Sequence, residues 1–166
     1  MNDITPRSSV SGRARRLLFL IARIALGAFF IYMGLVKALH PIDFLKLLRE
    51  YELGLSSFSM NTIAAILPWL EMFCGFCLVA GVAARGSALL VFLMLLGFTG
   101  AVLHRGLSIS RAEALALCAV RFDCGCGGGT QNVCRKLLEN TGLILLSLGV
   151  LKCCPKSFAP PADRKS

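Results

Sequence analysis

The chain has 166 residues, of which 56% are apolar and 16% are charged, whereas an ordinary soluble domain has about a quarter of its residues charged. This composition excludes a soluble globular protein and allows one domain of about four membrane-spanning helices. The net charge is +9, but the basic residues lie at the edges of apolar runs and form no continuous basic face. We therefore expect a partner surface of lipid and no nucleic acid.

Four apolar runs predict an all-α fold, a four-helix transmembrane bundle with short interfacial helices in the outer loops. The runs cover 17–39, 62–84, 87–104 and the shorter 134–151. The segment before them is polar and carries four arginines, so it offers nothing to bury. We expect a disordered cytoplasmic tail at 1–16, the membrane domain at 17–151 and a cytoplasmic tail at 152–166.

The basic residues also predict the orientation of the bundle. With the N-terminus in the cytoplasm, nine Lys and Arg lie inside and seven outside, and the three arginines just before the first run carry the most weight. This bias predicts a multi-pass protein of the inner membrane with both termini in the cytoplasm.

The first run carries a stripe of small and charged residues. Two glycines on this stripe allow a neighbouring helix to approach closely. Alternating steps of four and three place the members of the stripe on one face: Arg23, Gly27, Phe30, Gly34 and Lys37. In the loop that follows, Pro41 and an i, i+3, i+4 pattern of apolar residues from Phe44 to Leu55 predict a short helix on the outer surface that caps the bundle.

Glu71 lies in the middle of the second run, where an unpaired charge is costly. Arg23 and Lys37 lie at similar depths from Glu71 in an antiparallel helix pair, about 10 Å away along the axis, so either is a candidate partner. The pair is either a structural pin between two helices or part of a proton path or a quinone head-group contact. One turn later, Cys74 and Cys77 form a C-x-x-C pattern. They are small core residues or, where the helix unwinds, a relay to a lipid quinone.

In the third loop, Ser110 and Glu113 match a capping box and predict a short helix over 110–122. This helix leads to the sequence Asp-Cys-Gly-Cys-Gly-Gly-Gly, in which Cys124 and Cys126 are separated by one glycine. Two such thiols form a strained disulfide that readily oxidises other thiols. The alternative is a static bridge in a flexible loop.

Cys134 opens the last run, where the helix dipole and two adjacent basic residues favour its thiolate. We expect Cys134 to resolve a mixed disulfide at Cys124 or Cys126. Cys118 offers the same chemistry or is a buried small residue on an apolar helical face. A rival interpretation joins Cys118, Cys124, Cys126 and Cys134 in a zinc or iron-sulfur site, but their spacing matches no common metal motif.

With these residues taken together, the chain resembles the MauE branch of the DoxX-like membrane proteins, the methylamine utilisation protein family. The resemblance covers residues 17–151 and rests on elements whose order and spacing match: Gly27, Gly34 and Lys37, then Pro41 and Phe44, the sequence Leu-Pro-Trp-Leu-Glu that ends at Glu71 with Gly75 and Gly81, Arg105 and Gly106, the Asp-Cys-Gly-Cys-Gly element, and Asn140. Two departures are Gly127 in place of an aromatic residue and a longer third loop.

The resemblance implies a four-helix membrane bundle linked to disulfide formation in a periplasmic partner, such as the small subunit of methylamine dehydrogenase. From the residues and the resemblance we expect a membrane thiol-disulfide redox protein that acts on an exported cysteine-containing client, with a quinone as candidate electron acceptor. Two alternatives stay open: a non-enzymatic assembly factor for a cysteine-rich client, and a metal-thiolate or respiratory accessory subunit.

Overall fold

The computed structural model describes residues 8–123 and 130–153, and it is predominantly helical. In these two stretches the chain forms five helices and one short hairpin. The elements are α1 (Ser8–Leu39), α2 (Pro41–Glu50), α3 (Ser57–Ala80), α4 (Ala84–Ala112), β1 (Arg121–Asp123), β2 (Thr130–Asn132) and α5 (Val133–Cys153). The all-α class predicted from the apolar runs is confirmed.

Within the described residues, three helices are long and apolar enough to cross a membrane, over Arg16–Leu39, Ser57–Ala80 and Ala84–Ala112. The fourth apolar run also forms a helix, α5, at the place that the sequence indicates. Its first half carries Lys136, Glu139 and Asn140 among the apolar residues, which lowers its hydropathy. That α5 spans the bilayer therefore stays a prediction.

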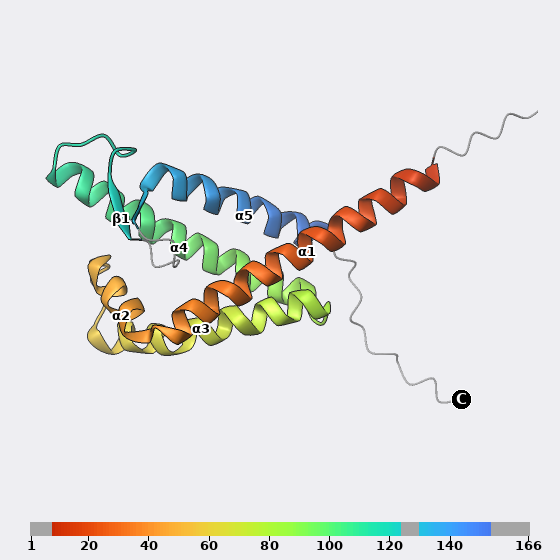
Figure 1. Cartoon of the computed structure of the whole chain (residues 1–166), viewed down its shortest axis with the longest axis horizontal. Coiled ribbons are helices and arrows are strands. Elements are labelled where there is room, and N and C mark those ends of the chain that lie inside the picture. Colours follow the sequence, from red (N-terminus) through yellow and green to blue (C-terminus); the bar gives the residue numbers. More distant parts are fainter. Residues whose placement is uncertain (1–7, 124–129, 154–166) are drawn as a thin grey trace, which may run out of the picture.

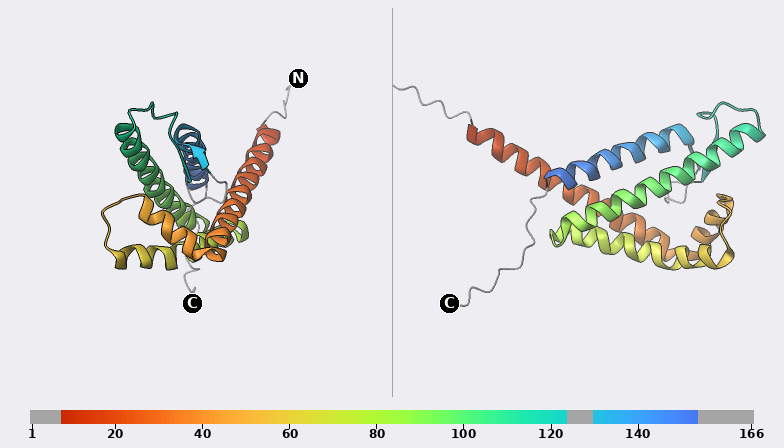
Figure 2. Two further views of the ribbon diagram at one scale, coloured as in Figure 1. Left: turned by 60° about the vertical axis from the view of Figure 1, so that its left-hand side comes forward. Right: turned by 180° about the vertical axis from the view of Figure 1, so that it is seen from behind.

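The long helices run up and down in antiparallel order (Figure 1). Helix α1 packs along α3, and α4 packs along α5. One end of the bundle, here called the loop end, carries α2 and the β1–β2 hairpin. The opposite end, here called the turn end, carries the α3–α4 connection and the last turn of α5 (Figure 2). The N-terminal part of α1 extends past the other helices at the turn end.

Close contact between α1 and α3 depends on glycines, as the stripe on the first run predicts. A Cβ atom added to Gly27 would lie 2.7 Å from the carbonyl oxygen of Gly75, and one added to Gly75 would lie 2.7 Å from that of Gly27. At Gly34 a Cβ would lie 2.6 Å from the carbonyl oxygen of Pro68. The two backbones therefore touch at three positions where only glycine fits.

Two buried clusters hold the helices together. The larger one joins all four long helices and contains Leu26, Phe30, Cys74, Leu78, Ala84, Ala88, Val91, Leu95 and Val150. The second lies at the loop end, where Leu47 of α2 and the adjacent Tyr51 pack against Val102, Val120 and Val133. Helix α2 begins at Pro41, which suits the first helical position. The predicted capping helix in the first loop is confirmed.

Several helix ends differ from the predicted ones because local capping sets them. Ser56 caps α3 by accepting a hydrogen bond from the Ser59 amide at 3.3 Å, which moves the start of this helix from 62 to 57. Gly81, with φ of 79°, ends α3 in the left-handed conformation, so the turn lies at 81–83 and Arg85 is already helical. Helix α1 begins at Ser8, inside the segment expected to be a disordered tail.

The short helix predicted over 110–122 is wrong. Helix α4 continues through Ala112, so Ser110 lies in its last turn and does not start a new helix. The Ser110 hydroxyl donates to the carbonyl oxygen of Leu115 at 2.6 Å, and the Leu115 amide donates to the Ser110 carbonyl at 3.1 Å. Ser110 therefore closes the turn by which the chain leaves α4. The chain then forms β1, which pairs with β2 in antiparallel register.

Candidate functional site

An ion pair joins α1 and α3 inside the bundle. Lys37 lies in the last turn of α1, and its Nζ donates to Oε1 of Glu71; the two side chains are 5% and 8% exposed. The same Nζ lies 5.4 Å from the ring centre of Phe44 and 5.8 Å from that of Phe98, within the range of a cation–π interaction. Of the two candidate partners that the sequence left open, Lys37 is the one that binds Glu71.

Arg23 lies elsewhere in the bundle. Its guanidinium approaches Gly81, where an added Cβ would lie 2.7 Å from Nη1. Gly81 follows Glu71 by ten residues, or about 15 Å along the helix axis, so Arg23 belongs to the turn end. Its Nε is buried and has no hydrogen-bond partner among the described residues. The structure thus does not bring Arg23 together with Lys37 and Glu71.

A cavity of about 40 Å³ borders the ion pair. Helices α1, α3, α4 and α5 all contribute to its wall, which is mostly aromatic and aliphatic. Its polar lining consists of Lys37, Glu71, Lys136 and Asn140, and its apolar lining of Phe29, Phe30, Met33, Met94, Leu95, Phe98 and Leu143. An apolar cavity with a few convergent polar groups is typical of a site that binds a ligand or water.

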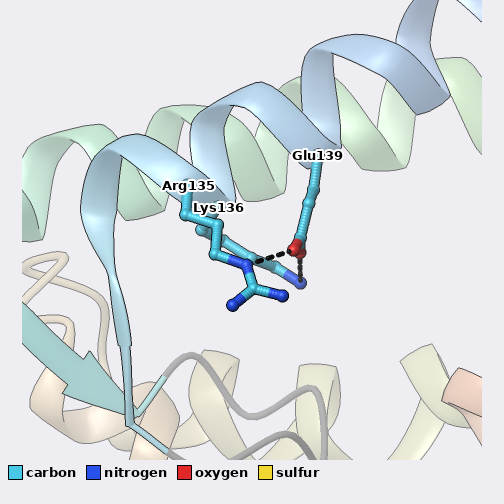
Figure 3. Close-up of polar contacts among 3 residues, drawn as sticks. All are labelled: Arg135, Lys136 and Glu139. Atoms are coloured by element: carbon cyan, nitrogen blue, oxygen red, sulfur yellow. Dashed lines mark hydrogen bonds and ion pairs between the residues drawn. The ribbon is translucent and has the colours of Figure 1, made fainter.

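Helix α5 brings two polar groups to this cavity. Asn140 is 2% exposed, and its Nδ2 has no hydrogen-bond partner among the described residues. Lys136 is 6% exposed and lies one turn before Asn140. The Nζ of Lys136 lies 3.5 Å from Glu139, whose other carboxylate oxygen accepts from Arg135 at 3.1 Å (Figure 3). Two cations thus share one carboxylate at the start of α5.

The C-x-x-C pair lies in an unbroken helix. Helix α3 runs without interruption from Ser57 to Ala80, so it does not unwind at Cys74 and Cys77. Both are free thiols. Cys74 is fully buried in the larger cluster against Leu26 and Phe30, where it acts as a small core residue. The alternative of a relay formed by local unwinding has no support in this conformation.

A disulfide joins Cys118 and Cys134 at the loop end, with their Cα atoms 5.0 Å apart. Cys118 lies on an exposed turn after α4, so the expectation of a buried residue on an apolar helical face is wrong. Cys134 is half-buried in the first turn of α5. The Val133 amide donates to the carbonyl oxygen of Val120 at 3.1 Å, which holds the two segments side by side.

Cys124 and Cys126 lie outside the described residues, so their exchange with Cys134 stays a prediction. Among the residues that the structure describes, no three His, Cys, Asp or Glu side chains are grouped as they would be around a metal ion. In the four-thiolate interpretation, two of the four cysteines are Cys118 and Cys134. Their sulfurs are bonded to each other here and provide no thiolate in this state.

The family model for methylamine utilisation protein MauE matches residues 15–152, which is most of the chain and includes the cavity and the disulfide. The chain belongs to the MauE family. No curated protein and no solved structure matches it. MauE membership and three apolar helices together identify a membrane protein of the methylamine utilisation type.

Sequence reasoning missed part of this MauE site. The sequence indicates Lys136 only as a basic residue next to Cys134, and Asn140 only as part of the family resemblance. In the structure both residues line the cavity. A signal was present in their spacing, because an i, i+4 pair of polar residues in an apolar helix lies on one face. A polar face on a membrane helix normally lies against other helices or a cavity.

Proposed function

We propose that this MauE-family protein is a thiol-disulfide redox protein of the inner membrane that supports disulfide formation in an exported, cysteine-containing partner. The observation that carries the proposal is the Cys118–Cys134 disulfide at the loop end, with Cys118 exposed. This bridge closes the chain segment that contains Cys124 and Cys126. It therefore keeps two pairs of cysteines within one short stretch of the chain.

The chemistry is a sequence of disulfide exchanges. A partner thiolate attacks the Cys124–Cys126 disulfide, a mixed disulfide forms, and the second partner thiol releases it. The partner is thereby oxidised by two electrons, and Cys124 and Cys126 become thiols. One of these two thiolates attacks Cys118, the exposed sulfur of the second bridge, and forms a mixed disulfide with it. Cys134 leaves as a thiolate that the N-terminus of α5 stabilises. The other thiol of the Cys124 and Cys126 pair then attacks the mixed disulfide, so that their disulfide forms again, Cys118 is released, and the two thiol protons pass to Cys118 and Cys134.

The last step needs a two-electron acceptor, and a membrane quinone is the proposed one. The thiols of Cys118 and Cys134 give two electrons and two protons to the quinone, which becomes a quinol, and the disulfide forms again. Cys134 lies in the first turn of α5 and Cys118 is bonded to it, so both sulfurs lie at the loop end, where the proposed topology gives a lipid-soluble acceptor access to them.

The proposed topology places this chemistry on the periplasmic side. Helix α5 is the fourth span, as expected for a DoxX-like bundle, and both termini are cytoplasmic. In support, the start of α1, the 81–83 turn and the end of α5 lie at one end of the bundle, and basic residues flank that end at Arg16, Arg85 and Lys152. The loop end with its cysteines then faces the periplasm.

The test is differential thiol alkylation with mass mapping in native membranes under nitrogen. Dithiothreitol should open the Cys118–Cys134 bridge, and decylubiquinone added after its removal should close it again. A double Cys74→Ala and Cys77→Ala variant is the matched control, since it removes the two free thiols of α3 and should behave like the native protein. A bridge that neither reagent changes would refute the redox proposal and favour the assembly factor, for which the bridge is only a structural link.

A further inference from the structure

Two buried polar atoms face the cavity without a protein partner among the described residues. One is Oε2 of Glu71, whose other oxygen binds Lys37, and the second is Nδ2 of Asn140. They come from α3 and α5, and both side chains line the same cavity. Unpaired polar atoms destabilise a protein interior, and those that persist are usually satisfied by internal water or have a functional role.

The size and chemistry of the cavity fit water. A buried water needs a cavity volume of about 10–15 Å³, counted as the space open to its centre, and two to four polar partners. The cavity has a volume of about 40 Å³ by the same measure. Oε2 of Glu71 accepts hydrogen bonds, whereas Nδ2 of Asn140 donates them. Water can donate to the first and accept from the second at the same time. A cation would be repelled by Lys37 and Lys136, which both line the cavity.

We propose that this cavity is a hydrated proton-transfer site, in which Glu71 takes up and releases protons through water held by Asn140. In uptake, the water that donates a hydrogen bond to Oε2 passes that proton to the carboxylate while it accepts a proton from a neighbouring water, so the cavity water stays neutral; release is the reverse. Among the described residues that line the cavity with Glu71, the charged ones are Lys37 from α1 and Lys136 from α5; α4 contributes only apolar side chains, and no charged residue of α2 is part of the wall.

The cavity lies toward the loop end of the bundle. Lys136 and Asn140 follow Cys134 by two and six residues on α5, which corresponds to about 3 Å and 9 Å along the helix axis. At this depth the proton site does not reach the turn end of the bundle, where Arg23 and Gly81 lie. The inference does not rest on the thiol chemistry, because the atoms that carry it belong to the cavity alone.

Radiolytic hydroxyl-radical footprinting of the full chain in lipid nanodiscs tests for the water. Radicals form from water at the site, so side chains beside internal water are oxidised even when they are buried. Met33 and Met94 line the cavity, whereas Met72 packs against Gly34 outside it. We expect Met33 and Met94 to be oxidised at least three times faster than Met72. Equal rates for the three methionines would overturn the proposal.

Two variants of α5 connect this labelling to Asn140. Asn140→Leu removes the amide and fills space, and it should lower oxidation of Met33 and Met94 to the rate of Met72. Ser147→Ala is the matched control, because Ser147 is a fully buried polar residue of the same helix whose hydroxyl is already bonded to the Ile144 carbonyl. It should leave the rates unchanged. Labelling that persists in Asn140→Leu would contradict the proposed role of Asn140.

Infrared spectroscopy tests the proton step. The native protein is taken from pH 9 to pH 5 in D₂O, and the spectrum of a Glu71→Gln variant under the same change is subtracted. We expect a carboxyl band that rises in the native protein, is absent in Glu71→Gln and is preserved in Ser147→Ala. A native spectrum that shows no Glu71-dependent band over this range would overturn the inference, because Glu71 would then exchange no proton. The result is independent of whether the cysteines are oxidised by a quinone.

Discussion

Lys37 of α1 donates a hydrogen bond to Glu71 of α3 inside the bundle, across 34 positions of the chain. The bond joins the same two helices that touch through Gly27, Gly34 and Gly75. The α1–α3 pair therefore combines a close backbone contact with one buried ion pair. Because both residues of the pair also line the cavity, any change to Lys37 or Glu71 alters both the stability of the bundle and the site.

Removing one partner of the ion pair should destabilise the protein strongly. Lys37→Met leaves the carboxylate of Glu71 buried without a counter-ion, and such a change costs about 3–5 kcal/mol in the free energy of unfolding. Unfolding by a titration of sodium dodecyl sulfate against mixed micelles measures the difference. Glu52→Gln is the control, because its pair with Arg105 is 69% exposed on the glutamate side and should contribute at most about 1 kcal/mol. Equal losses in the two variants would mean that the Lys37–Glu71 pair is not buried.

Adding one methyl group to the glycine contact should separate α1 from α3. In Gly75→Ala the new Cβ meets the Gly27 carbonyl oxygen at 2.7 Å, a clash with backbone that no side-chain rotation relieves. We expect a loss of about 1–3 kcal/mol in the free energy of unfolding. In the matched variant Gly100→Ala nothing lies within 4 Å of the new atom, so this change should be neutral or stabilising. Unfolding by the same detergent titration measures both variants, and similar free energies of unfolding would exclude the close contact.

Loss of the disulfide should loosen the loop end without unfolding the helices. The bridge closes a loop with a sequence separation of 16, and chain entropy predicts a stabilisation of about 3 kcal/mol for a loop of this length. In Cys118→Ser, hydrogen exchange of the amides in β1 and β2 should accelerate at least tenfold. Exchange in the middle of α3 should not change, and Cys74→Ala, which alters a buried free thiol, should leave the hairpin as it is. Unchanged exchange rates in β1 and β2 of Cys118→Ser would show that the disulfide does not stabilise the hairpin.

Reporter fusions should show whether α5 crosses the bilayer. With four spans and a cytoplasmic N-terminus, green fluorescent protein fused after residue 166 should fluoresce in cells. Alkaline phosphatase inserted at Gly54, an exposed residue in the loop after α2, should be active in the periplasm. If α5 does not span, the C-terminal reporter lies in the periplasm and stays dark while the Gly54 insertion remains active. A dark C-terminal reporter would therefore reject the fourth span.

The parts of this fold that sequence predicts are those set by local composition. Apolar runs indicate the long helices, the stripe of Gly27 and Gly34 indicates the close packing, and Glu71 requires a buried partner because an unpaired charge is costly in a membrane. The observed ends of α3 differ from the predicted ends by several residues, because the cap at Ser56 sets where the helix begins and the left-handed Gly81 sets where it ends. Periodicity alone carries no information about either.

The candidate site depended on relationships that sequence cannot provide. The sequence places Arg23 and Lys37 at similar expected axial distances from Glu71, so it cannot choose between them, whereas the packing of α1 on α3 selects Lys37. The pairing of Cys118 with Cys134 follows from the path of the third loop, where a capping-box pattern at Ser110 led to the wrong structure. The capping-box pattern at Ser110 is a genuine local preference, but the continuing apolar sequence of α4 and the contacts of the loop outweigh it.

The polar face of α5 has a consequence for the biogenesis of the protein. The apolar helices α1, α3 and α4 have the hydropathy to partition into the bilayer individually, whereas α5 carries Lys136 and Asn140 on the face that it buries. In the proposed four-span topology, insertion of α5 is therefore favourable only against the other three helices, which makes it the last step of assembly. A nascent chain that stops before residue 133 lacks the α5 side of the cavity wall, including Lys136 and Asn140.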